Sequence, residues 1–130
     1  MSSLLPDIIP SIGDITQLGV AYEAETNDTL EHEIFSYDVP LNTAVSIIVK
    51  VTKDTKGISG YFAHFEKVDV FKNSGGIVTD RNQVDLVVLR GSTTPADCYF
   101  TIVGTTVKFM VKNGIANQTF WKAIVAVVTV

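Results

Sequence analysis

The chain has 130 residues, of which 46% are hydrophobic and 18% are charged, so it can build one domain with a hydrophobic core and is too apolar to be disordered throughout. Valine, isoleucine and threonine account for 44 residues and leucine for only 7, a balance that favours β-sheet over helix. The single cysteine, Cys98, excludes an intrachain disulfide and a multi-cysteine zinc site.

The net charge of −4 is unevenly distributed along the chain. Residues 1–49 contain eight acidic residues and no lysine or arginine, whereas residues 50–130 contain ten basic and six acidic residues. Two explanations stay open: uneven surface charge on one domain, or an acidic N-terminal third that lies against a basic partner such as a neighbouring copy. The acidic balance and the lack of a basic cluster disfavour a nucleic-acid partner.

Residues 1–19 predict an extended N-terminal arm, because Pro6 and Pro10 interrupt any continuous helix. A short helix over residues 11–18 is an option, since Pro10 is suited to open one. We expect the apolar side chains of the arm to bind a partner or to fold back on their own domain: Leu4, Leu5, Ile8, Ile9 and Ile12. The arm lacks the positive start of a secretory signal, and no apolar run is long enough to span a bilayer, so no membrane partner is expected.

Residues 20–130 predict a single all-β domain. The expected strands are residues 30–37, 43–52, 61–71, 85–90, 98–103, 106–112 and 118–130. Gly104 and Thr105 predict a two-residue hairpin turn between two of them. Seven or eight strands at this spacing predict a single antiparallel β-sandwich that is jelly-roll-like.

Two of these strands depart from simple alternation. In residues 61–71 the aromatic first half and the pair Val68 and Val70 have opposite parity, so we expect a bulge near residues 66–67 that restores one buried face. The last strand is apolar on both sides. The side opposite Trp121 carries Phe120, Ile124 and Val128. We expect this strand to be central in its sheet, or these residues to bind another subunit.

The sequence contains no motif that predicts catalysis or a cofactor. A strand places His32 on the opposite face from its two glutamate neighbours, so these three residues do not converge on one metal ion. Asp80, Asn82 and Asp85 offer oxygen ligands, but their spacing lacks the glycine and the terminal glutamate of a calcium loop. We therefore expect no metal, no cofactor and no enzymatic activity.

The C-terminal strands resemble a module of tailed-bacteriophage structural proteins. The resemblance is carried by residues 104–116, a glycine hairpin followed by an alternating strand and a glycine turn, and by the segment Thr119-Phe120-Trp121-Lys122-Ala123. It implies a virion protein without catalytic activity, made in the host cytoplasm and located on the capsid surface or in the tail.

Within that resemblance, the preferred interpretation is a capsid cement (decoration) protein. It would form dimers or trimers and bind the shell, or a tail protein, through its arm and oligomeric contacts. The alternative is a tail-tip or fibre-associated module that binds a receptor or a glycan. In that case exposed aromatic residues would stack on sugar rings, with Tyr61, Tyr99 and Phe120 as candidates.

Overall fold

The computed structural model describes residues 14–91 and 96–129 as nine strands. The strands are β1 (Asp14–Thr26), β2 (Glu31–Asp38), β3 (Thr43–Thr55), β4 (Phe62–Ser74), β5 (Ile77–Asp80), β6 (Val84–Arg90), β7 (Asp97–Val103), β8 (Thr106–Lys112) and β9 (Thr119–Thr129). No helix that could cross a membrane occurs in these two ranges.

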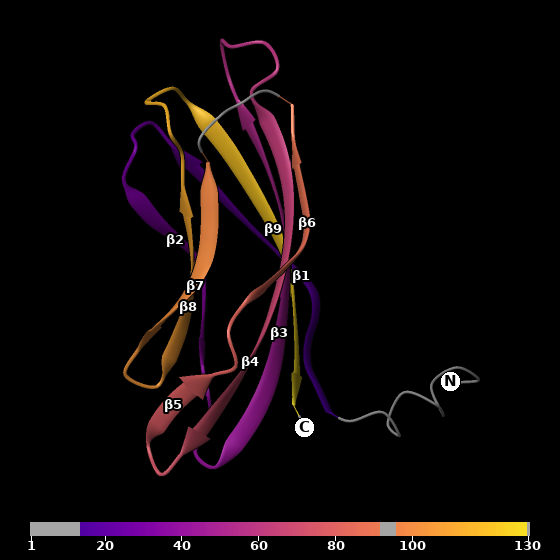
Figure 1. Cartoon of the computed structure of the whole chain (residues 1–130), viewed down its shortest axis with the longest axis vertical. Helices are drawn as coiled ribbons and strands as arrows, with labels where there is room; N and C mark the ends of the chain where they lie inside the picture. Colours follow the sequence, from indigo (N-terminus) through magenta and orange to yellow (C-terminus); the bar gives the residue numbers. More distant parts are fainter. Residues whose placement is uncertain (1–13, 92–95, 130) are drawn as a thin grey trace, which may run out of the picture.

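All strand pairs are antiparallel and form two sheets (Figure 1). The larger sheet has the order β1-β9-β3-β4-β5, and β6 also pairs with β4. The smaller sheet has the order β2-β8-β7. The predicted all-β antiparallel sandwich is thus confirmed, with β9 inside the larger sheet between β1 and β3.

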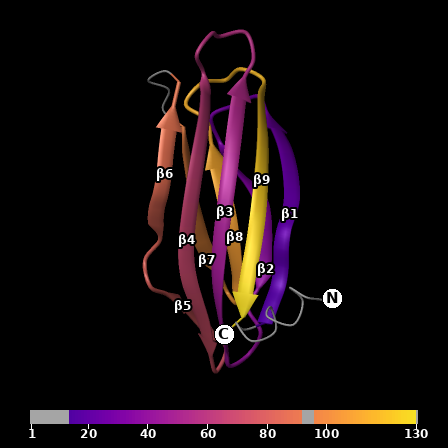
Figure 2. The same ribbon diagram turned by 90° about the vertical axis from the view of Figure 1, so that its right-hand side faces the viewer.

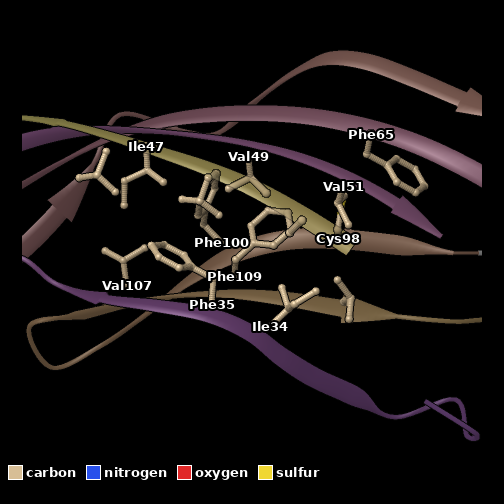
Figure 3. Close-up of a cluster of buried hydrophobic side chains, with 14 of the residues drawn as sticks. Ile34, Phe35, Ile47, Val49, Val51, Phe65, Cys98, Phe100, Val107 and Phe109 are labelled. Carbon is tan, nitrogen blue, oxygen red and sulfur yellow. The ribbon is translucent and has the colours of Figure 1, made fainter. Parts of the chain in front are cut away.

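The core lies between the two sheets and is built by alternating residues of the strands. On β9, Trp121, Ala123, Val125 and Val127 are buried, as their parity predicts. The rings of Phe100 and Phe109 of the smaller sheet meet edge to face at 5.0 Å. Figure 3 shows these rings facing the valines of β3. The close contact of branched and aromatic side chains holds the two sheets together.

The hairpin predicted at Gly104 and Thr105 is confirmed. Val103 of β7 pairs with Thr106 of β8, which leaves two residues in the turn. Gly104 has a φ of 62°, a left-handed conformation that costs little for glycine and favours the tight turns of hairpins.

The bulge expected in residues 61–71 is not on β4. The pairing of β3 with β4 is unbroken, so Val68 and Val70 point away from the core and Asp69 points into it. The irregularity lies instead on the partner strand β6, where the register skips one residue opposite Glu66 and Lys67. The expectation was wrong because it assigned the hydrophobic Val68 and Val70 to the core face. In the structure the carboxylate of Asp69 occupies that face instead.

Much of the predicted arm lies outside the described residues, including Leu4, Leu5, Ile8, Ile9 and Ile12. Strand β1 begins at Asp14, so residues 14–19 belong to a strand that pairs with β9. The part of the optional helix that the structure describes, residues 14–18, is therefore β-strand, because β9 offers a free edge to pair with it.

Candidate functional site

The larger sheet has one face on the core and one face turned away from the smaller sheet. We call the second the outer face, and Figure 2 shows the strands that form it side by side. The outward residues of β9 predicted from parity lie there: Phe120 and Ile124 are 41% and 43% exposed, and Val128 is half-buried. Their binding of another subunit stays a prediction, but their side chains are accessible to a partner.

One end of the outer face carries two aromatic rings beside a carboxylate. Asp54 of β3 is directly opposite Phe120 of β9 on one side and directly opposite Phe62 of β4 on the other. Phe62 is 57% exposed. Because neighbouring strands are about 4.8 Å apart, the two phenylalanines project from strands roughly 10 Å apart. We call Phe62, Asp54 and Phe120 the aromatic end.

Two shallow hollows adjoin the aromatic end. The first, with a volume of about 560 Å³, lies over β1, β9 and β3 and includes Phe120 and Asp54 in its wall. The second, of about 380 Å³, lies over β3, β4 and β6 and includes Phe62 and His64. Thr52 lines both, so the hollows are neighbours on the same face. A concave surface with apolar rings and a few polar groups is typical of ligand sites.

Charged groups of both signs surround the aromatic end. Lys56 Nζ lies 2.8 Å from Asp54 Oδ2 and 5.3 Å from the centroid of the Phe120 ring. His64 Nε2 lies 2.8 Å from Glu66 Oε2 on the same face of β4. These side chains supply hydrogen-bond donors and acceptors next to the two rings.

Gly91 sets the position of the Phe62 ring. A Cβ atom at Gly91 would lie 2.6 Å from two atoms of that ring and 2.5 Å from the carbonyl oxygen of Gly60. The amide of Gly91 also donates a hydrogen bond of 2.8 Å to the carbonyl of Phe62. Only a residue without a side chain lets the ring and the backbone approach so closely.

Beneath the aromatic end lies a buried polar network. Lys53 Nζ donates hydrogen bonds to Asn113 Oδ1 at 2.8 Å and to Thr55 Oγ1 at 3.1 Å. Asn113 Nδ2 in turn donates to Thr119 Oγ1 at 2.8 Å. Burial lowers the pKa of Lys53, helped by the charge of Arg90 and opposed by Asp54. The network gives a buried amine its hydrogen-bond partners and connects β3 with the end of β8 beneath the site.

The far end of the outer face is apolar. Ile48 of β3 lies opposite Val68 of β4 and Ala126 of β9. Val70 and Val128 flank Ser46, the next outward residue of β3. We call these five apolar residues the apolar end. Val70 is exposed and the other four residues are half-buried, so this end of the face is a candidate contact surface.

Other residues singled out by the sequence lie elsewhere. Tyr61 and Tyr99 are half-buried, and Tyr99 is on the smaller sheet, whereas Phe120 is on the larger one. Burial, followed by the hydrogen bond to Glu31, raises the pKa of Tyr99 to about 12. Cys98 is fully buried, which raises its thiol pKa to about 12 and makes it unreactive. Within residues 14–91 and 96–129, no group of three or more histidine, cysteine, aspartate and glutamate side chains is placed to hold a metal ion.

Sequence reasoning missed Phe62 and Asp54 as site residues. The parity of Phe62, opposite to that of Tyr61, Ala63 and Phe65, was the available signal. Nothing in the local sequence indicated that Asp54 would lie between two rings from other strands, because that position depends on the register of three strands.

No protein-family model matches the chain, and no curated protein matches it by sequence. Among solved structures it is similar to the tailspike protein of Acinetobacter baumannii phage AM24, with a TM-score of 0.50 and 12% identity over 85% of this chain and 26% of that chain. Tailspike protein gp49 of Acinetobacter baumannii bacteriophage Fri1, a capsular polysaccharide depolymerase, matches with a TM-score of 0.43 and 14% identity over 98% of this chain and 23% of that chain. The tailspike protein of Acinetobacter phage vB_ApiP_P1 matches with a TM-score of 0.36 and 13% identity, over 91% of this chain and 24% of that chain.

All three are phage tailspike proteins, and this chain spans about a quarter of the length of each. At these identities the likeness establishes the fold alone. It nevertheless corrects one expectation. The expectation of no enzymatic activity was wrong, because a tailspike that matches this chain in structure is described as a capsular polysaccharide depolymerase, which is an enzyme. A fold shared with such proteins gives no ground for excluding catalysis.

Proposed function

We propose that this chain is a module of a bacteriophage tail that binds a bacterial surface polysaccharide through the aromatic end of its outer face. The observation that carries the proposal is the row Phe62, Asp54 and Phe120, in which two exposed rings flank a carboxylate. The apolar faces of sugar rings stack on aromatic side chains, while a carboxylate accepts hydrogen bonds from sugar hydroxyls.

The spacing of the two strands that carry the rings suits an extended sugar chain. Strands two positions apart are separated by roughly 10 Å, which leaves room for a sugar unit over Asp54 between two stacked units. The adjoining hollows, with Thr52, His64 and Lys122, provide further polar groups for sugar hydroxyls. A shallow, open site of this kind suits a polymer better than a small molecule.

The fold match supports a tail location better than the capsid surface. The match with a TM-score of 0.50 is to a tailspike, and it covers 85% of this chain. The sequence analysis preferred a capsid cement protein, and the tail-associated alternative is the interpretation that this match favours. The class of ligand follows from the chemistry of the aromatic end, with capsular polysaccharide as the first candidate because a matching tailspike is described as acting on it.

Assembly with copies of itself remains part of the proposal. The apolar end of the outer face supports it, since two copies that pack there would remove Ile48, Val68 and Val70 from water. The predicted contribution of Leu4, Leu5, Ile8, Ile9 and Ile12 to contacts with a neighbouring subunit or a virion protein also stays a proposal, because these residues lie outside the described part of the chain.

Binding to purified capsular polysaccharides, among them those of Acinetobacter baumannii, tests the proposal. Biolayer interferometry should detect binding of the chain to at least one polysaccharide of a panel. Phe62→Ala and Phe120→Ala should each weaken it by about ten-fold or more, as loss of a stacked ring requires. Leu41→Ala removes an equally exposed apolar side chain outside this face and should leave binding unchanged. Undiminished binding by the double phenylalanine variant, or no binding to any member of the panel, would refute the proposal.

A further inference from the structure

A second candidate site lies on the core side of the larger sheet, at the point where β4 stops pairing with β6 and begins to pair with β5. Strand β5 pairs with β4 over Phe71–Ser74, and β6 pairs with β4 from Ala63 to Val68. Figure 2 shows β6 beside the upper part of β4 and β5 towards its lower end. Asp69 lies between these two stretches and points into the sandwich, where it is only 2% exposed.

The carboxylate of Asp69 is only half satisfied. Its Oδ1 accepts hydrogen bonds from the amides of Val70 at 2.7 Å and Arg81 at 3.3 Å. Its Oδ2 is buried and has no hydrogen-bond partner. An ionised oxygen without a partner is costly in such a place, so this atom is a candidate for binding a proton or a cation.

A second carboxylate increases that cost. Asp80, the last residue of β5, lies within hydrogen-bond reach of Asp69, and burial together with this neighbour raises the pKa of Asp69 to about 6. Among the residues that the structure describes, no lysine or arginine forms an ion pair with either group. Lys67 pairs with Asp85 at 3.1 Å, and the Arg90 guanidinium lies over the Phe65 ring at 5.3 Å.

We propose that Asp69 and Asp80 bind a calcium ion, with main-chain and water oxygens at the turn between β5 and β6 completing its coordination. Calcium takes six to eight oxygen ligands and accepts mixtures of carboxylate, carbonyl and water oxygens. A proton shared by the two carboxylates would neutralise only one of their two charges. A divalent cation balances both charges at neutral pH and supplies Oδ2 with a partner.

This site differs from the set Asp80, Asn82 and Asp85, whose spacing in the sequence did not fit a calcium loop. Asp85, which was one of those three residues, is held by Lys67. Asp69 takes its place, although it is eleven residues before Asp80 in the sequence, because the antiparallel pairing of β4 and β5 brings the two together. The site faces the core side of the sheet, so it is separate from the aromatic end and independent of the proposed polysaccharide binding.

Calcium titration of the intact chain, freed of metal with EDTA, tests the proposal. At pH 7.5, isothermal titration calorimetry should detect binding of CaCl2, and calcium should raise Tm. Asp69→Asn and Asp80→Asn should abolish both responses. Asp85→Asn, which neutralises a nearby acid outside the site, should retain both. Near-UV circular dichroism in EDTA shows whether each variant is folded.

Three outcomes would overturn the calcium site. The first is the absence of heat and of a Tm change at millimolar calcium. The second is an unchanged calcium response in folded Asp69→Asn. The third is a native chain that does not respond to calcium, with a Tm that rises from pH 7.5 to pH 5 while the Tm of Asp69→Asn does not. This result would mean that the two carboxylates share a proton instead. None of these results depends on polysaccharide binding, so the two proposals fail separately.

Discussion

Lys53 Nζ donates a hydrogen bond of 2.8 Å to Asn113 Oδ1, and this bond joins the two sheets of the sandwich. Lys53 belongs to β3 of the larger sheet, and Asn113 follows directly after β8 of the smaller sheet. Both side chains are buried. The bond therefore holds the end of the sandwich that lies beneath the aromatic end.

Asn113→Ala should lower the free energy of unfolding by about 2–4 kcal/mol, because it leaves the buried Lys53 amine without its shortest hydrogen bond and removes the bond to Thr119. Urea denaturation followed by circular dichroism measures this change. Lys112→Ala, at the exposed neighbouring position, is the control and should change the stability by less than about 0.5 kcal/mol. A loss no larger for Asn113→Ala than for the control would show that the network does not stabilise the fold.

Gly91→Ala should displace the Phe62 ring, since the new Cβ atom would lie 2.6 Å from it. We expect a loss of stability of about 1–3 kcal/mol and weaker polysaccharide binding. Gly75→Ala is the control for binding: nothing lies within 4 Å of the added atom, and its φ of 62° makes the substitution costly to stability far from the ring. Polysaccharide binding should separate the two variants: Gly91→Ala should bind more weakly and Gly75→Ala as tightly as the native chain. Equal binding by both variants would contradict the role given to the ring.

Val70→Asp should prevent self-association through the apolar end. A charged side chain in the middle of an apolar contact loses water without gaining a partner. Size-exclusion chromatography with light scattering should find a dimer or trimer of the native chain and a monomer of the variant. Leu41→Asp, at an exposed position outside the outer face, should keep the native mass. A native chain that is monomeric at high concentration would contradict the proposed assembly.

Asp69→Asn should stabilise the calcium-free protein at pH 7.5 by about 1–3 kcal/mol. The folded-state pKa of Asp69, about 6, is above its ordinary value of 3.8, so between these values the folded protein binds more protons than the unfolded one. Its contribution to the free energy of unfolding therefore increases as the pH falls through 6. The advantage of the variant should shrink as the pH falls below 6 and disappear only below about pH 4, where Asp69 is neutral in the unfolded chain as well.

Urea denaturation of both proteins in EDTA from pH 5 to pH 8 measures this difference. Asp85→Asn is the control, since Asp85 is exposed and paired with Lys67. A difference between native and Asp69→Asn that stays constant over this pH range would contradict the shifted pKa.

The local patterns of this sequence determined the strands and their faces. The alternation of residues 43–52, the glycine turn at Gly104 and the two-sided apolar character of residues 118–130 each reflect interactions between near neighbours, and the structure has these elements where the patterns place them. The outward position of Phe120, Ile124 and Val128 follows from the two-residue period of a strand alone.

Only the tertiary structure decided which faces meet and which residues share a site. Phe62, Asp54 and Phe120 form one row because β4, β3 and β9 pair in a particular register, although Phe120 is more than fifty residues away along the chain. Asp69 occupies a core position beside Asp80 for the same reason. Register depends on the packing of the whole core, and a shift of one residue would turn each of these side chains to the opposite face.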